Sequence, residues 1–212
     1  MDMIEIKHRQ SGVILLKVDA PSLRGFKKQS AKLAGGDFTG DDLPGARLPY
    51  ADLRQCKFDN AILRGADLRY ADMAGASFRN ADLSEANLLE ADMVGCELQH
   101  AKLVKAKLAY CRLTGSDLSH ADLSHCDLMS ADMRASFKNA ILTDAKLQGA
   151  NLTGTVLIGA NLVNANMTGA TIQGVQLFGA KLDGAINALG KPFPANRAGP
   201  PRRRAWWKFW DS

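Results

Sequence analysis

The sequence is poor in aromatic residues and has no long apolar run. Phe, Trp and Tyr make up 7% of its 212 residues, whereas 46% are hydrophobic and 19 are glycines. A core of this composition has to use small and medium side chains, which favours thin, regular layers. No segment approaches the roughly 18 continuous apolar residues of a membrane-spanning helix, and the N-terminus lacks the apolar stretch of a signal peptide. We therefore expect a soluble, cytoplasmic protein.

Cysteine and histidine are also scarce, which limits the chemistry available. The cysteines all occupy the place where Ala stands in neighbouring segments: Cys56, Cys96, Cys111 and Cys126. We interpret them as small buried hydrophobes with reduced thiols, not as disulfide partners or metal ligands. His100 and His120 are predicted to stack on one corner, with His125 at the next corner of the same coil. The three could be drawn as a metal site, but we interpret them as corner residues that replace Asn. Because no nucleophile with a base and no concave pocket is indicated, we predict no enzyme activity, cofactor or metal.

What the sequence has in abundance is a five-residue repeat. From Ala31 the chain reads AKLAG, GDFTG, DDLPG, ARLPY, ADLRQ and CKFDN. Apolar residues at the unit centres recur every five residues from Leu33 to Met133, and again from Phe137 to Leu182, with one residue missing between the two runs. Short repeats of this kind stack into solenoids in which neighbouring coils share a continuous core.

The consensus of the repeat is a small residue, Asp or Asn, Leu or Phe or Met, a polar residue, and Gly or another polar residue. Over residues 31–184 it resembles the pentapeptide-repeat family. The resemblance implies an all-β fold, namely a right-handed quadrilateral parallel β-helix in which four pentapeptides form one coil. At four units a coil, the repeats would make a solenoid of about 8 coils.

A longer period, equal to four units, supports the count of four units per coil independently. Two sets of aromatic residues share it, allowing for the missing residue: Phe38, Phe58, Phe78 and Phe137 at unit centres, and Tyr50, Tyr70 and Tyr110 at unit ends. Identical side chains pack well on one another in register, so the missing residue should shorten one corner without rotating the coils. Positions one and three of each unit should point inward, and positions two, four and five should face water. On this interpretation Leu83→Asp unfolds several coils, whereas Asp82→Ala barely changes the stability.

We divide the chain into three parts. Residues 1–30 are predicted to form an N-terminal β-hairpin cap over residues 3–18, followed by a connector whose last unit would place Lys28 in the core and is therefore excluded from the repeats. Residues 31–184 form the β-helix. Residues 185–212 are predicted to be a flexible C-terminal tail rich in Pro, Arg and Trp.

Charge and apolar residues are unevenly distributed along the rod. Residues 31–184 carry 15 Lys and Arg against 18 Asp and Glu, so the net charge of +5 arises at the ends of the chain. Towards the C-terminus the rod is nearly uncharged, and Ile158 and Phe178 are predicted to stack on its surface beside Val156. A stacked apolar cluster on a flat wall suggests a contact surface.

Three functions remain open on these observations. The first is a scaffold or protein-interaction module that presents flat solenoid walls, including Ile158 and Phe178, to a partner protein or to a second copy of the chain through the C-terminal coils. The second comes from the resemblance, because some pentapeptide-repeat proteins that confer fluoroquinolone resistance are DNA mimics that bind type II topoisomerases such as gyrase. In that alternative these carboxylates would replace phosphates: Asp52, Asp72, Asp92, Glu85, Glu90 and Glu97. The present rod departs from those relatives because it is only mildly acidic and has no loop insertions.

The third function involves the C-terminal tail, which combines cations with interfacial aromatic rings. Such a segment could associate peripherally with a membrane surface or bind nucleic acid. The residues concerned are Arg202, Arg203, Arg204, Trp206, Trp207 and Trp210.

Overall fold

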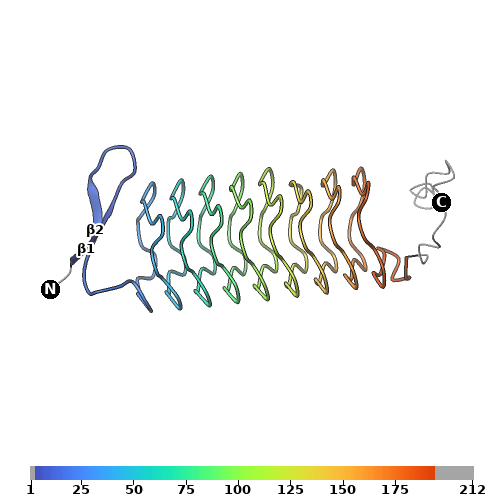
Figure 1. Cartoon of the computed structure of the whole chain (residues 1–212), viewed down its shortest axis with the longest axis horizontal. Coiled ribbons are helices and arrows are strands. Elements are labelled where there is room, and N and C mark those ends of the chain that lie inside the picture. The colour runs from blue at the N-terminus through green and yellow to red at the C-terminus, as the bar shows by residue number, and fades with distance from the viewer. Residues whose placement is uncertain (1–2, 194–212) are drawn as a thin grey trace.

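A computed structural model describes residues 3–193. Strand β1 (Met3–Lys7) and strand β2 (Ile14–Asp19) pair in antiparallel orientation. The hairpin predicted over residues 3–18 is therefore present. The chain then continues as a rod of stacked coils, with the hairpin at its N-terminal end (Figure 1).

Each regular coil of the rod takes four units. Asp52 forms a parallel bridge with Asp72, and Asp72 forms the next bridge with Asp92. Four columns of such bridges run along the rod, one for each unit of a coil. We number the columns from the units of one coil, which are column 1 (51–55), column 2 (56–60), column 3 (61–65) and column 4 (66–70). The predicted period of four units is confirmed by this register.

The missing residue makes one coil shorter than the others. Asp117 pairs with Ser136, and Asp132 pairs with Asn151, so the columns continue across the shortened unit. Phe137 remains a buried unit centre in column 2, the column that holds the other central phenylalanines. The prediction that the corner is trimmed without rotating the coils is confirmed.

The core is built from positions one and three of the units. Ala81 and Leu83, for example, are completely buried. The rings of Phe38 and Phe58 stack with centroids 4.6 Å apart, and those of Phe58 and Phe78 stack at 4.9 Å. Because successive coils place equal side chains on top of one another, a chain with few aromatic residues still fills its core.

Positions two and five of the units shape the corners. Position five adopts positive φ, as at Asn60 (60°) and Gly65 (62°), which Gly and Asn tolerate best. At position two, Asp82 Oδ1 accepts a hydrogen bond from the backbone N–H of Ser84 at 3.0 Å. The acidic residue therefore does more than face water, because it satisfies a backbone donor of the turn. This contact corrects the expectation that Asp82→Ala is almost neutral.

The hairpin closes the N-terminal edge of the rod. The Arg9 N–H donates to Gly35 O at 2.8 Å, and the Asp37 N–H donates to Lys7 O at 2.9 Å. Ile6 is 2% exposed and belongs to the core. The predicted capping of the first coil is confirmed, since the hairpin supplies both backbone partners and apolar cover to an edge that would otherwise be exposed.

The coiled backbone begins before residue 31. Lys27 forms a parallel bridge with Arg47, and Leu23 is buried. The side chain of Lys28 is exposed. Because this unit lies at the edge of the rod, its backbone follows the coil without placing the lysine in the core.

At the other end, the first residues of the predicted tail complete the last coil. Ile186 bridges to Asn166, and the Phe193 N–H donates to Ala185 O at 3.0 Å. Phe193 also packs against the core. In the part of the chain that the structure describes, no helix is long and apolar enough to cross a membrane.

Candidate interaction surfaces

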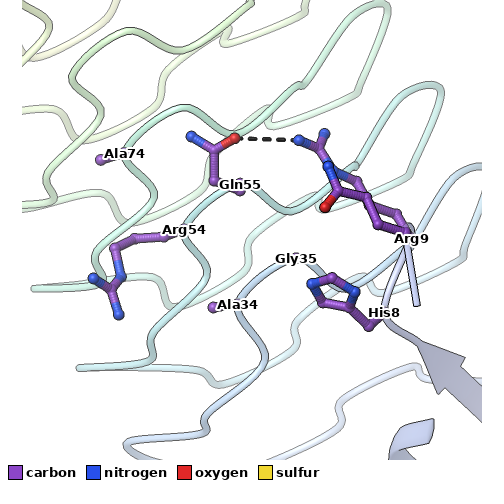
Figure 2. Close-up of a pocket in the computed structure, with 8 residues that line it drawn as sticks. His8, Arg9, Ala34, Gly35, Arg54, Gln55 and Ala74 are labelled. Carbon is purple, nitrogen blue, oxygen red and sulfur yellow. Dashed lines mark hydrogen bonds between the residues drawn. The ribbon is translucent and has the colours of Figure 1, made fainter. Parts of the chain in front are cut away.

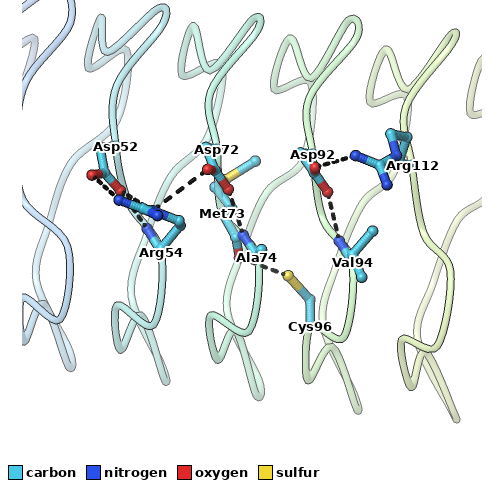
Figure 3. Close-up of polar contacts among 9 residues, drawn as sticks. All are labelled: Asp52, Arg54, Asp72, Met73, Ala74, Asp92, Val94, Cys96 and Arg112. Carbon is cyan, nitrogen blue, oxygen red and sulfur yellow. Dashed lines mark hydrogen bonds and ion pairs between the residues drawn. The ribbon is translucent and has the colours of Figure 1, made fainter.

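The predicted acidic residues of column 1 lie on successive coils, as Figure 3 shows. Arg54 Nε and Nη2 donate to the two carboxylate oxygens of Asp52 at 2.8 and 2.7 Å. Arg54 Nε also lies 3.5 Å from Asp72 Oδ2, and Arg112 Nη1 donates to Asp92 Oδ2 at 2.5 Å. The hydrogen bonds from Arg54 hold the pKa of Asp52 below its usual range. The negative charge of this column is therefore compensated within the rod.

The glutamates proposed to replace phosphates are mostly paired as well. Glu97 lies 3.0 Å from Arg79, and Glu85 lies 3.6 Å from Arg64. Glu90 forms no ion pair with any described residue. Five of the six candidate carboxylates are thus tied to arginines, which leaves much less free negative charge than the sequence suggested.

The apolar cluster near the C-terminus is assembled as predicted. Gly159 N–H donates to Phe178 O at 2.9 Å, which places Phe178 one coil after Ile158 in column 2. Phe178 is 85% exposed, whereas Ile158 and Val156 are half-buried. Val156 also borders a shallow depression at the shortened corner beside Ala135. The cluster thus places one strongly exposed apolar side chain beside two half-buried ones.

The remaining predicted site residues belong to the C-terminal tail. They lie outside residues 3–193, so the structure does not place them: Arg202, Arg203, Arg204, Trp206, Trp207 and Trp210.

A depression of about 490 Å³ lies where the hairpin meets the first coils (Figure 2). Arg9 Nη2 donates to Gln55 Oε1 at 3.2 Å across it. His8 Nδ1 accepts a hydrogen bond from the Ser11 N–H at 3.2 Å and lies 3.0 Å from Ser11 Oγ. These contacts hold the hairpin turn and join it to the rod. Because no described carboxylate orients His8 as a base, the Ser11 hydroxyl and His8 do not form a catalytic triad.

The four cysteines are free and buried. The thiol of Cys56 donates to Leu33 O at 3.0 Å, and that of Cys96 donates to Met73 O at 3.1 Å. Burial raises the pKa of both thiols to about 12. They are therefore protonated, unreactive core groups at neutral pH.

Histidine side chains form a ladder on one corner. The rings of His100 and His120 stack with centroids 5.0 Å apart, and His120 Nε2 lies 3.4 Å from the Asn139 amide nitrogen. Among residues 3–193, no group of three or more His, Cys, Asp or Glu side chains is arranged to hold a metal ion.

Comparison with known families agrees with the register of the rod. Eight copies described as pentapeptide repeats match over residues 29–60, 61–99, 96–134, 134–157 and 145–184. The chain belongs to the pentapeptide-repeat family. No curated protein matches the sequence.

Solved structures similar to this pentapeptide-repeat chain include HetL, a protein involved in heterocyst differentiation regulation in the cyanobacterium Nostoc sp. strain PCC 7120. It is 31% identical over 80% of this chain and 92% of HetL, with a TM-score of 0.28. QnrB1, a plasmid-mediated fluoroquinolone resistance protein, is 24% identical over 78% of this chain and 86% of its own, with a TM-score of 0.37. Rfr23 from the cyanobacterium Cyanothece 51142 is 35% identical over 56% and 64% of the two chains, with a TM-score of 0.25.

The structure of this pentapeptide-repeat protein also brings together a surface that sequence reasoning missed. In column 4, positions four and five carry several apolar and aromatic side chains, which Arg69 and Glu90 interrupt. We call these side chains the apolar seam: Tyr50, Tyr70, Leu89, Ala109, Tyr110 and Met129. The rings of Tyr50 and Tyr70 stack with centroids 4.7 Å apart. Tyr50 is 54% and Tyr110 59% exposed, while Leu89 and Met129 are half-buried. Writing the sequence in rows of four units would have aligned Leu89 with Met129.

Proposed function

We propose that this pentapeptide-repeat protein is a non-enzymatic scaffold, or protein-interaction module, that presents flat solenoid walls to a partner protein. The observation that carries the proposal is the presence of strongly exposed apolar side chains, such as Phe178 and Tyr110, at fixed positions on the rod. A continuous backbone ladder holds these side chains, so binding orders little of the protein. Apolar groups of this kind are typical contact residues of protein interfaces.

The architecture and location are part of the same proposal. Four columns of parallel bridges support a four-sided coil, to which we add the right-handed sense that the family resemblance implies. Four buried free thiols support a reducing, cytoplasmic environment.

The test is affinity capture from native cell extract with the full-length protein. We expect a specific protein to be retained, and we expect exposed-surface variants such as Phe178→Glu or Tyr110→Glu to reduce its retention at least tenfold without changing the melting temperature. A different pentapeptide-repeat protein serves as the control for background capture. The proposal would be contradicted if the folded protein retained no partner in a larger amount than this control does.

The duplex-mimic alternative requires exposed negative charge, whereas arginines neutralise most of the candidate carboxylates. It is tested by gyrase supercoiling assays with the wild-type protein and a variant carrying Asp52→Asn, Asp72→Asn and Asp92→Asn. The asparagines keep the side-chain oxygens that accept backbone hydrogen bonds and remove only the charge. We expect no effect of either protein on supercoiling. Inhibition by the wild type that is lost in the variant would replace the scaffold proposal with the duplex-mimic function.

Association through the tail is a separate possibility. Deletion of residues 198–212 tests it in binding assays with anionic liposomes and with duplex DNA. Binding that is present in the full chain and lost on deletion would assign this role to the tail, whereas unchanged binding would exclude it.

A further inference from the structure

The two ends of the rod differ in how their edges are closed. The hairpin covers the N-terminal edge, whereas the last coil lies at the opposite end (Figure 1). In the coil before it, the Leu157 N–H donates to Gln176 O at 2.8 Å. The corresponding N–H of Leu177, one coil later, donates to no described residue, and neither does that of Ile172. This edge therefore presents backbone donors that have no partner within residues 3–193.

The apolar core is also incompletely covered at this end. Ile172, Val175, Leu177 and Leu182 pack against the core but remain partly exposed, and we call them the terminal face. Leu157, in the coil before, is only 1% exposed. A solenoid end that combines backbone donors without partners and exposed core side chains favours a covering segment, which the hairpin supplies at the other end.

The last described residues already begin to cover the terminal face. Pro192 forms an antiparallel bridge with Ile186, so the chain has reversed its direction. The Phe193 N–H donates to Ala185 O at 3.0 Å, and in the inner coils the carbonyl at position one accepts from the next coil. Phe193 therefore lies at the level of a further coil, above column 4. An antiparallel continuation from Ala185 leads towards Leu182 and the terminal face.

We propose that residues 194–212 dock on the terminal face and cover it with the indole rings of Trp206, Trp207 and Trp210. This segment follows Phe193 directly and is nearly as long as a complete coil of four units. It contains all the tryptophans of the chain, which are its largest side chains. The covalent connection gives the segment a high effective concentration beside the face, which a separate partner lacks.

The composition of the segment suits the end of a β-ladder. Pro194, Pro200 and Pro201 have carbonyls that accept hydrogen bonds from the edge, but they have no N–H to offer to a further strand. Charge does not select this occupant, because the last coil carries only Lys181 and Asp183 on its described surface. The match between the segment and the terminal face is apolar.

A second copy of the rod fits the terminal face less well. Head-to-tail stacking is hindered because the hairpin closes the N-terminal edge, where Asp37 N–H donates to Lys7 O. Stacking of two C-terminal ends would place Pro192 and Phe193 of each copy between the two faces, since these residues already lie above column 4. The segment that follows Phe193 meets neither obstacle.

Tryptophan fluorescence tests the proposal directly, because every tryptophan of the chain lies in residues 194–212. In the full-length protein we expect emission at a shorter wavelength than in a synthetic peptide of this segment, and several-fold weaker quenching by acrylamide. Ile172→Gln/Leu177→Gln on the terminal face should move the emission towards that of the peptide. The matched control is Ile158→Gln/Phe178→Gln, which alters the nearby wall and should leave the emission unchanged.

The other outcomes would overturn the proposal. Emission and quenching equal to those of the peptide would show that the rod does not cover the tryptophans. An equal or larger response to the control variant would place them on the wall. Emission that moves to a shorter wavelength only with anionic vesicles would assign the segment to a membrane surface. A change that accompanies dimerisation in sedimentation experiments would assign the terminal face to a second copy.

Hydrogen exchange provides a second measurement that needs no variant. In the full-length protein we expect slow exchange of the N–H groups of Ile172, Leu177 and Leu182, because residues 194–212 would cover them. Exchange as fast as in an exposed turn would contradict the proposal even if the double variants failed to fold. Circular dichroism and melting temperatures establish whether both double variants keep the wild-type fold.

Discussion

At the residue scale, each position of the unit has a separate physical task. Position three fills the core, as Leu83 does, while position two accepts a hydrogen bond from the backbone of the turn, as Asp82 does. The two positions are adjacent in sequence, yet their substitutions should differ in both size and chemical sensitivity. The hydrogen bond made by Asp82 explains the frequency of Asp and Asn at position two, since both carry the required oxygen.

Substitutions at Leu83 and Asp82 test this division. We expect Leu83→Asp to cost more than about 4 kcal/mol of unfolding free energy, because a charge would be buried without a partner. Asp82→Ala should cost about 1 kcal/mol through the lost hydrogen bond, and Asp82→Asn should be nearly neutral. Urea denaturation followed by circular dichroism measures all three. Equal losses for the alanine and asparagine variants would show that the charge matters and the hydrogen bond does not.

Asp41 is a second residue with a distinct prediction. It stands at position one of column 3, where the following coils have Ala61 and Ala81. Burial raises its pKa, and the charge of Asp37 adds to the effect. The folded protein therefore holds this proton more tightly than the unfolded chain. The protonated carboxyl therefore favours the folded state. This contribution to stability is complete below the pKa of Asp41 in the unfolded chain, about 4, and is lost as the pH rises through its raised pKa in the folded protein.

Asp41→Ala should consequently raise the melting temperature at pH 7, by an amount equivalent to about 1 kcal/mol or less because the carboxylate remains partly solvated. The gain should shrink at pH 3, where Asp41 is protonated in both states. Ala61→Asp, one coil further into the core, serves as the opposite control and should be strongly destabilising at pH 7. Thermal melts from pH 3 to pH 7 measure the effect. A gain that is independent of pH would show that packing, and not ionisation, distinguishes the variants.

At the element scale, the decisive contact is between the hairpin and the first coil. His8 packs over Gly35, where an added Cβ atom would lie 2.4 Å from His8 Nε2. A Cβ atom added at Gly36 would lie 2.9 Å from Leu33 O and from the Phe38 ring, and 3.3 Å from Cγ2 of Ile6 in the hairpin. The consecutive glycines therefore let the hairpin approach the backbone of the coil. Glycine is needed here for the packing of the hairpin as well as for the conformation of the turn.

Gly35→Ala should weaken this docking. Its positive φ of 71° alone costs an alanine about 1 kcal/mol, and the contact with His8 adds to the loss. We expect faster hydrogen exchange in Met3–Asp19 and a lower melting temperature. Gly45→Ala is the matched control, because Gly45 has φ of 64° and no atom within 4 Å of the added Cβ. Comparable exchange in the two variants would show that the hairpin does not depend on the close approach.

At the scale of the whole molecule, the rod is a one-dimensional stack whose columns must stay in register. Its energetics should then be a sum over coils and over the contacts between neighbouring coils. The shortened coil before Phe137 shows that a unit can lose one residue when the columns are preserved. Loss of register should be less well tolerated than loss of length.

Deletions test this directly. Removal of residues 61–80 deletes one complete coil and preserves every column, so the product should fold cooperatively with a modestly lower melting temperature. Removal of residues 61–70 deletes only two units and shifts all later columns by half a coil. We expect it to lose about 1–3 kcal/mol more than the longer deletion, because unlike side chains are then stacked. A higher stability of the shorter deletion would contradict the importance of register.

The sequence alone predicted the repeat, the period of four units, the inward positions and the capping hairpin, because periodic apolar residues such as Phe38, Phe58 and Phe78 must stack if they are to be buried together. It also predicted the neighbouring positions of Ile158 and Phe178. It did not predict that Arg54 and Arg112 neutralise the acidic column, since ion pairs depend on side-chain conformations that periodicity does not specify. Within residues 3–193, the tertiary structure thus decided which surface groups are available. Periodicity determines which residues share a column, whereas the availability of each group depends on its neighbours within and across the coils.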